Sequence, residues 1–495
     1  MKSLLTIAMA LCWLPLSLLA DEKEVVNEAP QFEVKGVVVD ENGGPLPGAS
    51  VWVKGTVVGA GTDVNGNFSF KLTTTEKCVL RVSFTGYTPE ERTVTPGADT
   101  LYRFQLRPSD NPLDEVVVTS LRVPKPLKEV PVVTRVISRS DIERLNPLDL
   151  QSLLEYQMPG LQFGIAHGSG LPELKYQGST GGYVLFMIDG ERVAGEGSSN
   201  NIDYNLVDID NVERVEIVKG PMSTLYGSNA MGGVVNIITR DAGRPFTGEV
   251  SARYGTNDEQ KYSLSLGTKQ GRFSSMTTGS YRKRDAYAVE DEEGQISYTH
   301  YKDIHGQDSV VADTSTLGLT SVKGFEIWQA SEKLSFTFNE RLRASLKGAY
   351  YHNKVLDYAA GKVWDEFSNY SINPQVYYSI NANHYLDVTY LYENYVKREK
   401  NNAGKNDKVF GDQTNTARIV YTGQLGEKHL LTAGAELNTQ RLRHYWFGNG
   451  TGRVYEAQNY AVYVQEDWRV SDKFNVVAGV RGNIHSKYGF HASPS

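Results

Sequence analysis

The side chains that could carry out chemistry are scattered along this chain of 495 residues. The sequence has nine histidines and two cysteines, and none of them has the spacing of an HExxH zinc motif or of a paired-cysteine site. A G-x-S-x-G nucleophile elbow and a glycine-rich phosphate loop are also absent from it. We therefore expect no enzyme and no bound cofactor, and we look for a function in binding or transport.

One run of residues is suited to binding another protein through its backbone. It is Leu113-Asp114-Glu115-Val116-Val117-Val118-Thr119, inside a linker at 109–126 that contains three prolines. β-branched residues favour a strand, but the linker offers this strand nothing local to pair with. The run is either one more strand of the preceding domain or a strand that a partner protein adds to its own sheet. Its position between two domains favours the second interpretation.

Composition excludes two other classes of protein. The chain has 51 Lys and Arg against 58 Asp and Glu, a net charge of −7, which does not fit a basic nucleic-acid-binding protein. Its mean hydropathy is −0.39, and beyond the N-terminal segment it has no stretch of about 18 apolar residues, so a helical membrane protein is excluded. A membrane β-barrel stays open, because its strands alternate apolar and polar residues.

The N-terminal segment is typical of an export signal. Lys2 precedes an apolar stretch at 4–19, and Ala20 stands before a charged run. We expect a signal peptide at 1–20. Its removal takes Cys12 away and leaves Cys78, which cannot form an internal disulfide.

Residues 32–108 read as short β runs separated by turn clusters, and we expect a β-sandwich. Asn-Gly pairs at 42–43 and 65–66 supply the positive φ that tight hairpins need. The motif G-x-V-x-D at 36–40, followed by L-P-G-A-x-V at 46–51, resembles the carboxypeptidase-regulatory-like domain. This resemblance implies a sandwich without catalytic groups, of a type that often precedes outer-membrane transporters of the Bacteroidetes.

Residues 127–241 change to a mixed α/β pattern. Ser140 and Glu143 have the spacing of a capping box, and leucines at 148, 150, 153 and 154 line a second helix. Two strands are expected at 183–188 and 212–218. Charged residues on the second strand fit a domain enclosed in a water-filled lumen.

The stretch at 225–239, LYGSNAMGGVVNIIT, together with IDGERV at 188–193, resembles the plug domain of TonB-dependent receptors. The run Leu113–Thr119 then resembles the TonB box of these receptors. The resemblance implies that TonB, a protein of the inner membrane, pairs with this box after a ligand binds, and that the proton-motive force remodels the plug. The chain would thus be a transporter in the outer membrane, in contact with outer-membrane lipid.

From residue 246 to 495 a period of two dominates, which predicts antiparallel barrel strands with one apolar and one polar face. The eleven expected segments are 247–255, 260–268, 271–284, 324–338, 341–354, 370–381, 384–398, 413–424, 428–444, 456–470 and 473–485. Tight turns alternate with long polar loops at 285–323, 355–369, 399–412 and 445–455. The expected interfacial aromatics are Tyr350, Tyr351, Tyr378, Tyr390, Tyr392, Tyr463 and Trp468.

The fold class expected is therefore mainly β: a sandwich, an α/β plug and about eleven strands of a transmembrane barrel. Plugged transporters have 22 strands, so eleven make an open half-barrel around the plug. Residues 491–495 show no strand pattern. We expect a chain that is truncated at its C-terminal side.

The ligand is inferred from two stretches of the plug. The residues at 186–197 look most like the plugs of haemin receptors, and the ending at 227–239 resembles receptors for siderophores, haem and cobalamin. His167, in a glycine-rich stretch of the plug, is the candidate axial ligand of haem. The alternatives are transport of cobalamin or another nutrient, and a binding-only surface protein whose barrel displays loops.

Overall fold

The computed structural model describes residues 32–494 with gaps. The gaps are 42, 47–48, 55–58, 64, 73–76, 85–86, 96–100, 109–115, 118–124, 127–131, 159, 166–171, 177–178, 181–183, 194, 197–200, 221, 228–229, 244, 291–296, 303–307, 314–318, 340, 358–361, 382, 401–405, 427, 445–452 and 472–473. The expected signal peptide at 1–20 lies outside the described residues. Within the described ranges, no helix has the length and apolar character to cross a membrane.

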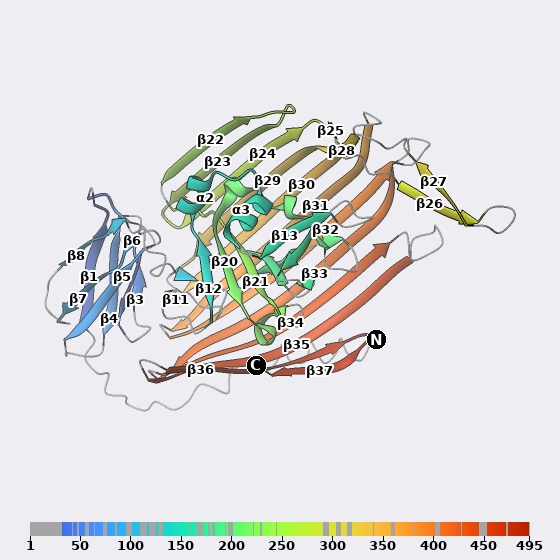
Figure 1. Ribbon diagram of the computed structural model, residues 1–495. Coiled ribbons are helices and arrows are strands. Elements are labelled where there is room, and N and C mark those ends of the chain that lie inside the picture. Colours follow the sequence, from blue (N-terminus) through green and yellow to red (C-terminus); the bar gives the residue numbers. More distant parts are fainter. Residues whose placement is uncertain are drawn as a thin grey trace.

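The N-terminal part folds into two facing sheets (Figure 1). The first has the order β4-β1-β8, with bounds Asn67–Leu72, Phe32–Val39 and Leu101–Gln105. The second has the order β3-β2-β5-β7, with bounds Gly59–Gly61, Ser50–Val53, Cys78–Ser83 and Glu90–Val94. Side chains alternate along these strands, so Phe68, Phe70 and Leu72 of β4 all point into one apolar core. The sandwich expected from the sequence is confirmed.

The middle part is a five-stranded sheet with helices packed on it. Its order is β12-β20-β21-β16-β17, with bounds Thr134–Ile137, Val212–Lys219, Gly233–Thr239, Val184–Ile188 and Glu191–Arg192. Helices α2 (Arg139–Leu145) and α3 (Leu150–Gln157) contribute Ile142, Leu153 and Leu154 to its core. Residues 134–239 therefore form an α/β unit with its own apolar interior, and we call this unit the plug.

The first plug helix begins earlier than the capping pattern predicted. Ser138, not Ser140, is the N-cap: its Oγ accepts a hydrogen bond from the backbone N–H of Asp141, and the Asp141 carboxylate accepts one from the N–H of Ser138. Aspartate thus replaces the expected glutamate in the capping box. The sequence contains both serines, and only the backbone geometry shows which of them is the N-cap.

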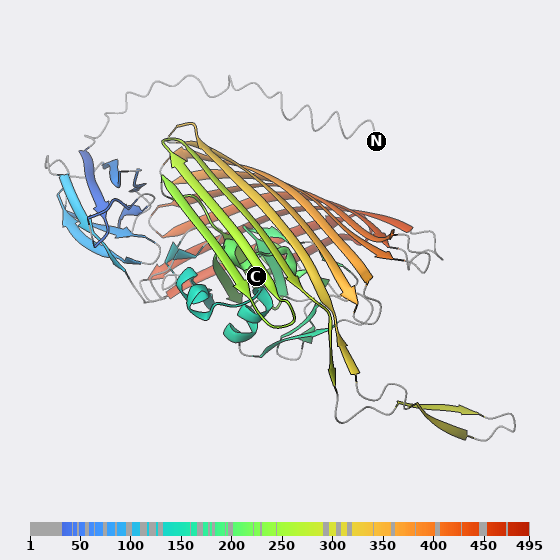
Figure 2. The same cartoon turned by 90° about the horizontal axis from the view of Figure 1, so that it is seen from above.

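The C-terminal half is one antiparallel sheet of twelve strands in sequence order. Their bounds are β22 Phe246–Tyr254, β23 Gln260–Gln270, β24 Phe273–Arg284, β29 Gly324–Thr337, β30 Leu342–Asp357, β31 Lys362–Asn381, β32 His384–Lys400, β33 Asn406–Leu425, β34 His429–His444, β35 Arg453–Ser471, β36 Phe474–His485 and β37 Gly489–Pro494. The sheet is open, with β22 and β37 at its edges, and it curves around the plug (Figure 2). The expected architecture of an open barrel around a plug is confirmed, and we call this sheet the wall.

The wall departs from the sequence prediction in three respects. Residues 489–494 form a twelfth strand, although they show no alternation, because their backbone pairs with β36 from His485↔Gly489 to Val480↔Pro494. Strands β31 and β33 also continue into segments predicted as loops, at 362–369 and 406–412. The long loop at 285–323 carries two further antiparallel pairs, β25 (Tyr287–Glu290) with β28 (Leu319–Val322) and β26 (Ser297–Lys302) with β27 (Asp308–Asp313).

Most of the expected interfacial aromatics face outward. Tyr350, Tyr378, Tyr390 and Trp468 are each about half exposed on the outer face of the wall. Tyr351 and Tyr463 are an error of the prediction, since both are nearly fully buried and contact the plug. Adjacent residues of a strand point to opposite faces, so Tyr350 and Tyr351 could not both lie in the lipid interface.

The two ends of the wall differ. Short turns join strands at one end, and the sandwich lies near that end (Figures 1 and 2). The pair β26–β27 extends from the opposite end, where the long connections lie. We refer to these as the turn end and the loop end.

Candidate functional site

Only part of the expected partner-binding strand is described. Val116 and Val117 form β10, while the other five residues of Leu113–Thr119 lie outside the described residues, as does His167. Contrary to the prediction, β10 has a local partner: it pairs antiparallel with β11 (Lys125–Pro126), at Val116↔Pro126 and Val117↔Lys125. A ladder of two residues is marginal by itself. A longer strand from another protein could therefore replace it.

The candidate functional site that is described best is the contact between the plug and the inner face of the wall. The turn after β16 carries Asp189 and Gly190, both with positive φ (52° and 82°), and projects the Asp189 carboxylate toward β30. This carboxylate accepts hydrogen bonds from the N–H and Oγ1 of Thr239 at 2.8 and 2.7 Å and forms an ion pair with Lys347 of the wall. Burial alone would raise the pKa of Asp189, but Lys347 and Lys333 hold this pKa well below its usual value.

A second group of contacts continues along the same turn. The guanidinium of Arg418 from β33 pairs with Glu191 of the plug and lies 3.5 Å from Glu436 of β34. Arg481 from β36 lies 3.0 Å from the same Glu436. Its guanidinium also donates to the carbonyl of Leu225 in α4 (Ser223–Tyr226). Alternating charges therefore connect two separate plug segments through three strands of the wall.

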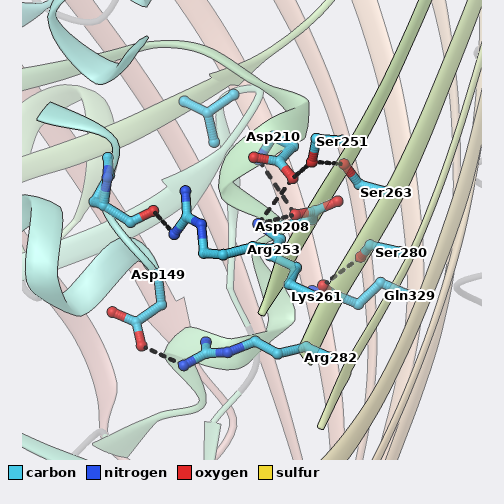
Figure 3. Close-up of polar contacts among 12 residues, drawn as sticks. Asp149, Asp208, Asp210, Ser251, Arg253, Lys261, Ser263, Ser280, Arg282 and Gln329 are labelled. Atoms are coloured by element: carbon cyan, nitrogen blue, oxygen red, sulfur yellow. Dashed lines mark hydrogen bonds and ion pairs between the residues drawn. The ribbon is translucent and has the colours of Figure 1, made fainter. Parts of the chain in front are cut away.

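Polar pairs also hold the other side of the plug (Figure 3). Lys261 of β23 lies 3.3 Å from Asp208 and 2.9 Å from Asp210, and Arg282 of β24 lies 3.1 Å from Asp149, the N-cap of α3. Burial would raise the pKa values of Asp149 and Asp210, but their basic partners lower both. These carboxylates are thus kept charged by side chains of the wall.

One buried carboxylate of the plug is held by phenols, with no Lys or Arg among its hydrogen-bond partners in the part of the chain that the structure describes. Asp203, fully buried at the start of a short 3-10 helix (Tyr204–Leu206), accepts hydrogen bonds from the hydroxyls of Tyr351 and Tyr395 at 2.7 and 3.1 Å. Burial raises the pKa of Asp203, and these hydrogen bonds only partly offset that effect. The two tyrosines belong to an apolar cluster of the wall that packs on Leu206.

A cavity of ≈ 110 Å³ lies between the plug and β24, β29, β30, β31 and β32. Its lining combines charged side chains such as Arg192 and Lys347 with apolar ones such as Leu206 and Leu391. A small-molecule site usually needs about 300 Å³ or more, so this space holds a few waters and not a large ligand.

The sequence analysis missed the wall residues that hold the plug. Lys261, Arg282, Lys347 and Arg418 all lie on the polar phase of the strand alternation, which was the available signal. Their partners stand up to 227 positions away in the chain, a separation that no local pattern reports. Among the described residues, no group of His, Cys, Asp and Glu side chains could hold a metal ion.

Comparisons with known proteins agree with this architecture. Residues 126–234 match the TonB-dependent Receptor Plug Domain, and residues 34–118 match the CarboxypepD_reg-like domain. Among solved structures, the ferric enterobactin receptor PfeA of Pseudomonas aeruginosa is similar, with a TM-score of 0.63 at 18% identity over 77% of this chain and 60% of that one. The siderophore receptor PirA of Acinetobacter baumannii has a TM-score of 0.57 at 18% identity, over 73% and 58% of the two chains.

These likenesses at low sequence identity establish the fold. The chain spans about 60% of the length of the first receptors it matches.

Proposed function

We propose that this chain, a TonB-dependent receptor of the outer membrane with an N-terminal carboxypeptidase-regulatory-like domain, imports an iron chelate. The observation that supports import most directly is the plug itself, which lies against the inner face of the wall and is held there by ion pairs such as Asp189–Lys347. A chelate cannot pass until the plug moves. Moving it requires energy from outside the chain, because the periplasm has no ATP.

The proposed point of energy input is the segment Leu113–Thr119. Its described residues, Val116 and Val117, lie in a two-residue ladder about ten positions ahead of the first plug residues matched. We propose that TonB replaces β11 as the partner of β10 and pulls on the chain leading into the plug. A backbone ladder transmits such a pull along the strand, since its hydrogen bonds act together.

For the ligand we propose a ferric siderophore, with haem as the second candidate. The similar structures named above are receptors for ferric enterobactin and other siderophores. The haemin-like residues Phe186 and Met187 are 1% exposed in the plug interior, so their likeness reflects core packing and not contact with a ligand. The alternatives of a cobalamin transporter or a binding-only surface protein have no observation in their favour here.

Uptake measurements test this proposal. Cells that carry the gene at its own locus are given ferric enterobactin labelled with radioactive iron, or haem, as the only iron source. We expect uptake of one of the two, dependent on the gene and lost in a strain without TonB. Surface binding that persists with no uptake in either strain would identify a binding-only protein.

The haem candidate has its own test in His167. If its imidazole is an axial ligand of haem iron, His167→Ala weakens haem binding and shifts the absorption spectrum of the bound haem. An unchanged spectrum and affinity would remove His167 from the site. Iron uptake from ferric enterobactin serves as the control for correct assembly of the variant.

A further inference from the structure

A single carboxylate lies on the outer face of the wall, away from both ends of its strand. Its neighbours on β29 face the plug. Gln329 donates a hydrogen bond to the carbonyl of Asn205 at 2.7 Å, and Ser331 accepts one from Asn211 at 3.2 Å. Successive side chains of a strand point to opposite faces, so Glu332 points outward. This strand therefore presents an acidic group to the surroundings of the wall.

The depth of Glu332 follows from the aromatic residues on either side of it. Trp328 stands four residues toward the loop end and Phe336 four residues toward the turn end, and they are 48% and 41% exposed. Each has a second ring beside it, Tyr281 at 4.3 Å and Phe338 at 4.8 Å between centroids. Aromatic residues mark the two interfaces of a membrane barrel. Four residues of a strand that is tilted by about 40° cover about 10 Å along the membrane normal, so Glu332 lies near the middle of an apolar band about 25 Å tall.

The residues level with Glu332 on the neighbouring strands leave it open to the membrane. Thr277 of β24 and Gly348 of β30 stand directly opposite it, and Leu266 and Ile372 follow on the next strands. Leu266 and Ile372 are 41% and 49% exposed. A Cβ at Gly348 would meet no atom within 4 Å. The described side chains therefore leave a notch beside the carboxylate.

The carboxylate accepts hydrogen bonds but has no cation. The hydroxyl of Ser275 donates to one of its oxygens at 2.6 Å, and that of Thr277 donates to the other. Lys333 and Lys347, on the same strand and the next, point inward and pair with aspartates there. Among the residues that the structure describes, no Lys, Arg or His forms an ion pair with Glu332. An uncompensated charge on the lipid face destabilises a barrel, and an ionisable residue within a membrane is usually kept for a function.

Other outward-facing carboxylates of the wall are paired and lie near the strand ends. Glu326, on the same face of β29 at the loop end, lies 3.5 Å from Lys354. Glu466, near the turn end of β35, lies 2.6 Å from His429. Glu332 differs from both in its depth and in its lack of a basic partner. Glu326 provides a matched control for experiments.

The chemistry at this depth selects a protein as the partner. Lipid chains offer neither a cation nor a hydrogen-bond donor, and the apolar band excludes water. A second copy related by a two-fold axis along the membrane normal would bring another Glu332 to the same depth, where like charges repel strongly. A lysine or arginine on the surface of another membrane protein complements the charge, and the notch at Gly348 lets its backbone approach closely.

We propose that the outer face of β24, β29 and β30 around Glu332 binds another protein of the outer membrane, which presents a lysine or arginine at the middle of the bilayer. In the complex the basic group pairs with Glu332, and its aliphatic stem lies in the notch at Gly348. The proposal rests on the place of the wall in the outer membrane and not on the chelate that is imported. The uptake measurements and the experiments below can therefore fail independently.

The first experiment uses the purified protein alone in phosphatidylcholine vesicles. Glu332→Leu removes a charge that has no cation in the isolated protein, so it should raise the urea concentration at the midpoint of unfolding of the wall. Glu326→Leu removes a carboxylate that has its own lysine and should not raise this midpoint. An unchanged or lower midpoint for Glu332→Leu would show that its bonds to Ser275 and Thr277 are its whole role, and would overturn the proposal.

The second experiment looks for the partner in whole cells. The photoreactive amino acid p-benzoylphenylalanine replaces Leu346, which is exposed on the outer face of β30, or Val388 on the outer face of β32 as a control. We expect a crosslinked product with another outer-membrane protein from the first position only. Its yield should fall about tenfold or more in Glu332→Gln, because a desolvated ion pair is lost, and should not change in Glu326→Gln. Equal yields in the two variants, or a product made only of two copies of this chain, would overturn the proposal.

An exchange of charges decides whether the contact is an ion pair. The crosslinked segment of the partner should contain a lysine or arginine, and replacing that residue with glutamate should remove the product. Glu332→Lys should then restore it, whereas Glu326→Lys should not. A segment without a basic residue, or an exchange that restores nothing, would contradict the proposal. If Glu332→Lys fails to assemble, the unfolding midpoint of Glu332→Leu still tests the proposal without any partner.

Discussion

The plug has an interior and a boundary of different chemistry. Its interior is apolar, since Leu153, Phe186 and Val215 are each at most 1% exposed. The removal of these apolar side chains from water stabilises the interior. Its boundary with the wall is mainly polar, with pairs such as Asp189–Lys347 and Lys261–Asp210, although Tyr463 adds an apolar contact. Water can replace a polar contact far more easily than a packed side chain. A pull on the plug should therefore separate it from the wall before its interior unfolds.

The largest effect is expected from a variant that prevents the proposed pull of TonB on the plug. Val117→Pro takes a backbone N–H out of β10 and should abolish TonB-dependent uptake, with at least a hundredfold loss, because a strand that cannot donate pairs poorly. β10 precedes the first strand of the plug sheet, β12, in the chain, so the variant should assemble normally. Uptake of labelled ferric chelate measures the effect, and Val117→Ile is the control. Normal uptake by the proline variant would show that the energy enters elsewhere.

A cavity in the interior of the plug should lower its free energy of unfolding strongly. Phe186 packs edge-on against Tyr204, with ring centroids 5.2 Å apart. Phe186→Ala should lower the free energy of unfolding of the plug by about 3 to 5 kcal/mol. Hydrogen exchange of the amides of β20 and β21 measures this loss. Phe336→Ala, on the outer face of β29, is the control and should not change plug exchange. Equal effects of the two substitutions would mean that plug and wall unfold as one unit.

The sequence predicted the strands of the wall because a period of two is visible along each strand. It placed the segment at 384–398 within β32 and the one at 428–444 within a residue of β34. It missed β37, whose partner strand and not its own residue pattern makes it a strand. It also placed Tyr351 and Tyr463 on the outer face of the wall, whereas both are buried on the inner face, since an aromatic residue fits either the lipid interface or a buried contact.

The contacts of the candidate site could be predicted only as classes of residue. The charges of Glu213, Arg214 and Glu216 were expected to fit a domain enclosed in a polar lumen, and no sequence pattern indicated that Arg214 lies 2.8 Å from Glu216, which is fully buried. The contacts that hold the plug join residues as many as 256 positions apart, and only the three-dimensional fold brings them together. The resemblance of the plug motif identified the domain without naming one of these contacts.

The boundary itself is tested by Asp189→Asn. This change leaves Lys347 without its carboxylate and should weaken the docking of the plug by about 3 kcal/mol, since breaking one partner of a buried pair leaves a charge uncompensated. The double variant Asp189→Asn with Lys347→Gln should recover part of the loss, and exchange at β16 and β21 would report both. Additive losses in the double variant would mean that the two side chains act independently.

The same pair should make docking depend on pH. The lowered pKa of Asp189 means that its contribution is fully present above the unfolded value of about 3.9 and is lost as the pH falls through the lower value of the folded state. Docking should therefore be constant at neutral pH and weaken only in strong acid. A loss of docking between pH 5 and 7 would point to a different group.

The smallest effect is expected at Asp203. This buried carboxylate of the plug is held by phenols, whereas Asp189 is held by a lysine. Its pKa is raised by burial, so its stabilising protonated form is complete below the unfolded value of about 3.9, and stability is lost as the pH rises through the higher value of the folded state. Asp203→Asn is neutral at every pH and should change plug stability by less than about 1 kcal/mol at pH 7. It should also remove the pH dependence that lies above the unfolded value of about 3.9, measured by the same hydrogen exchange. Tyr351→Phe, which removes the donor 2.7 Å from the carboxylate, is the companion variant and should cost about 1 kcal/mol.

If Asp203→Asn instead weakens the plug as much as Asp189→Asn does, then Asp203 is charged at neutral pH, and the charge of a boundary carboxylate matters even where no lysine or arginine is bound to it.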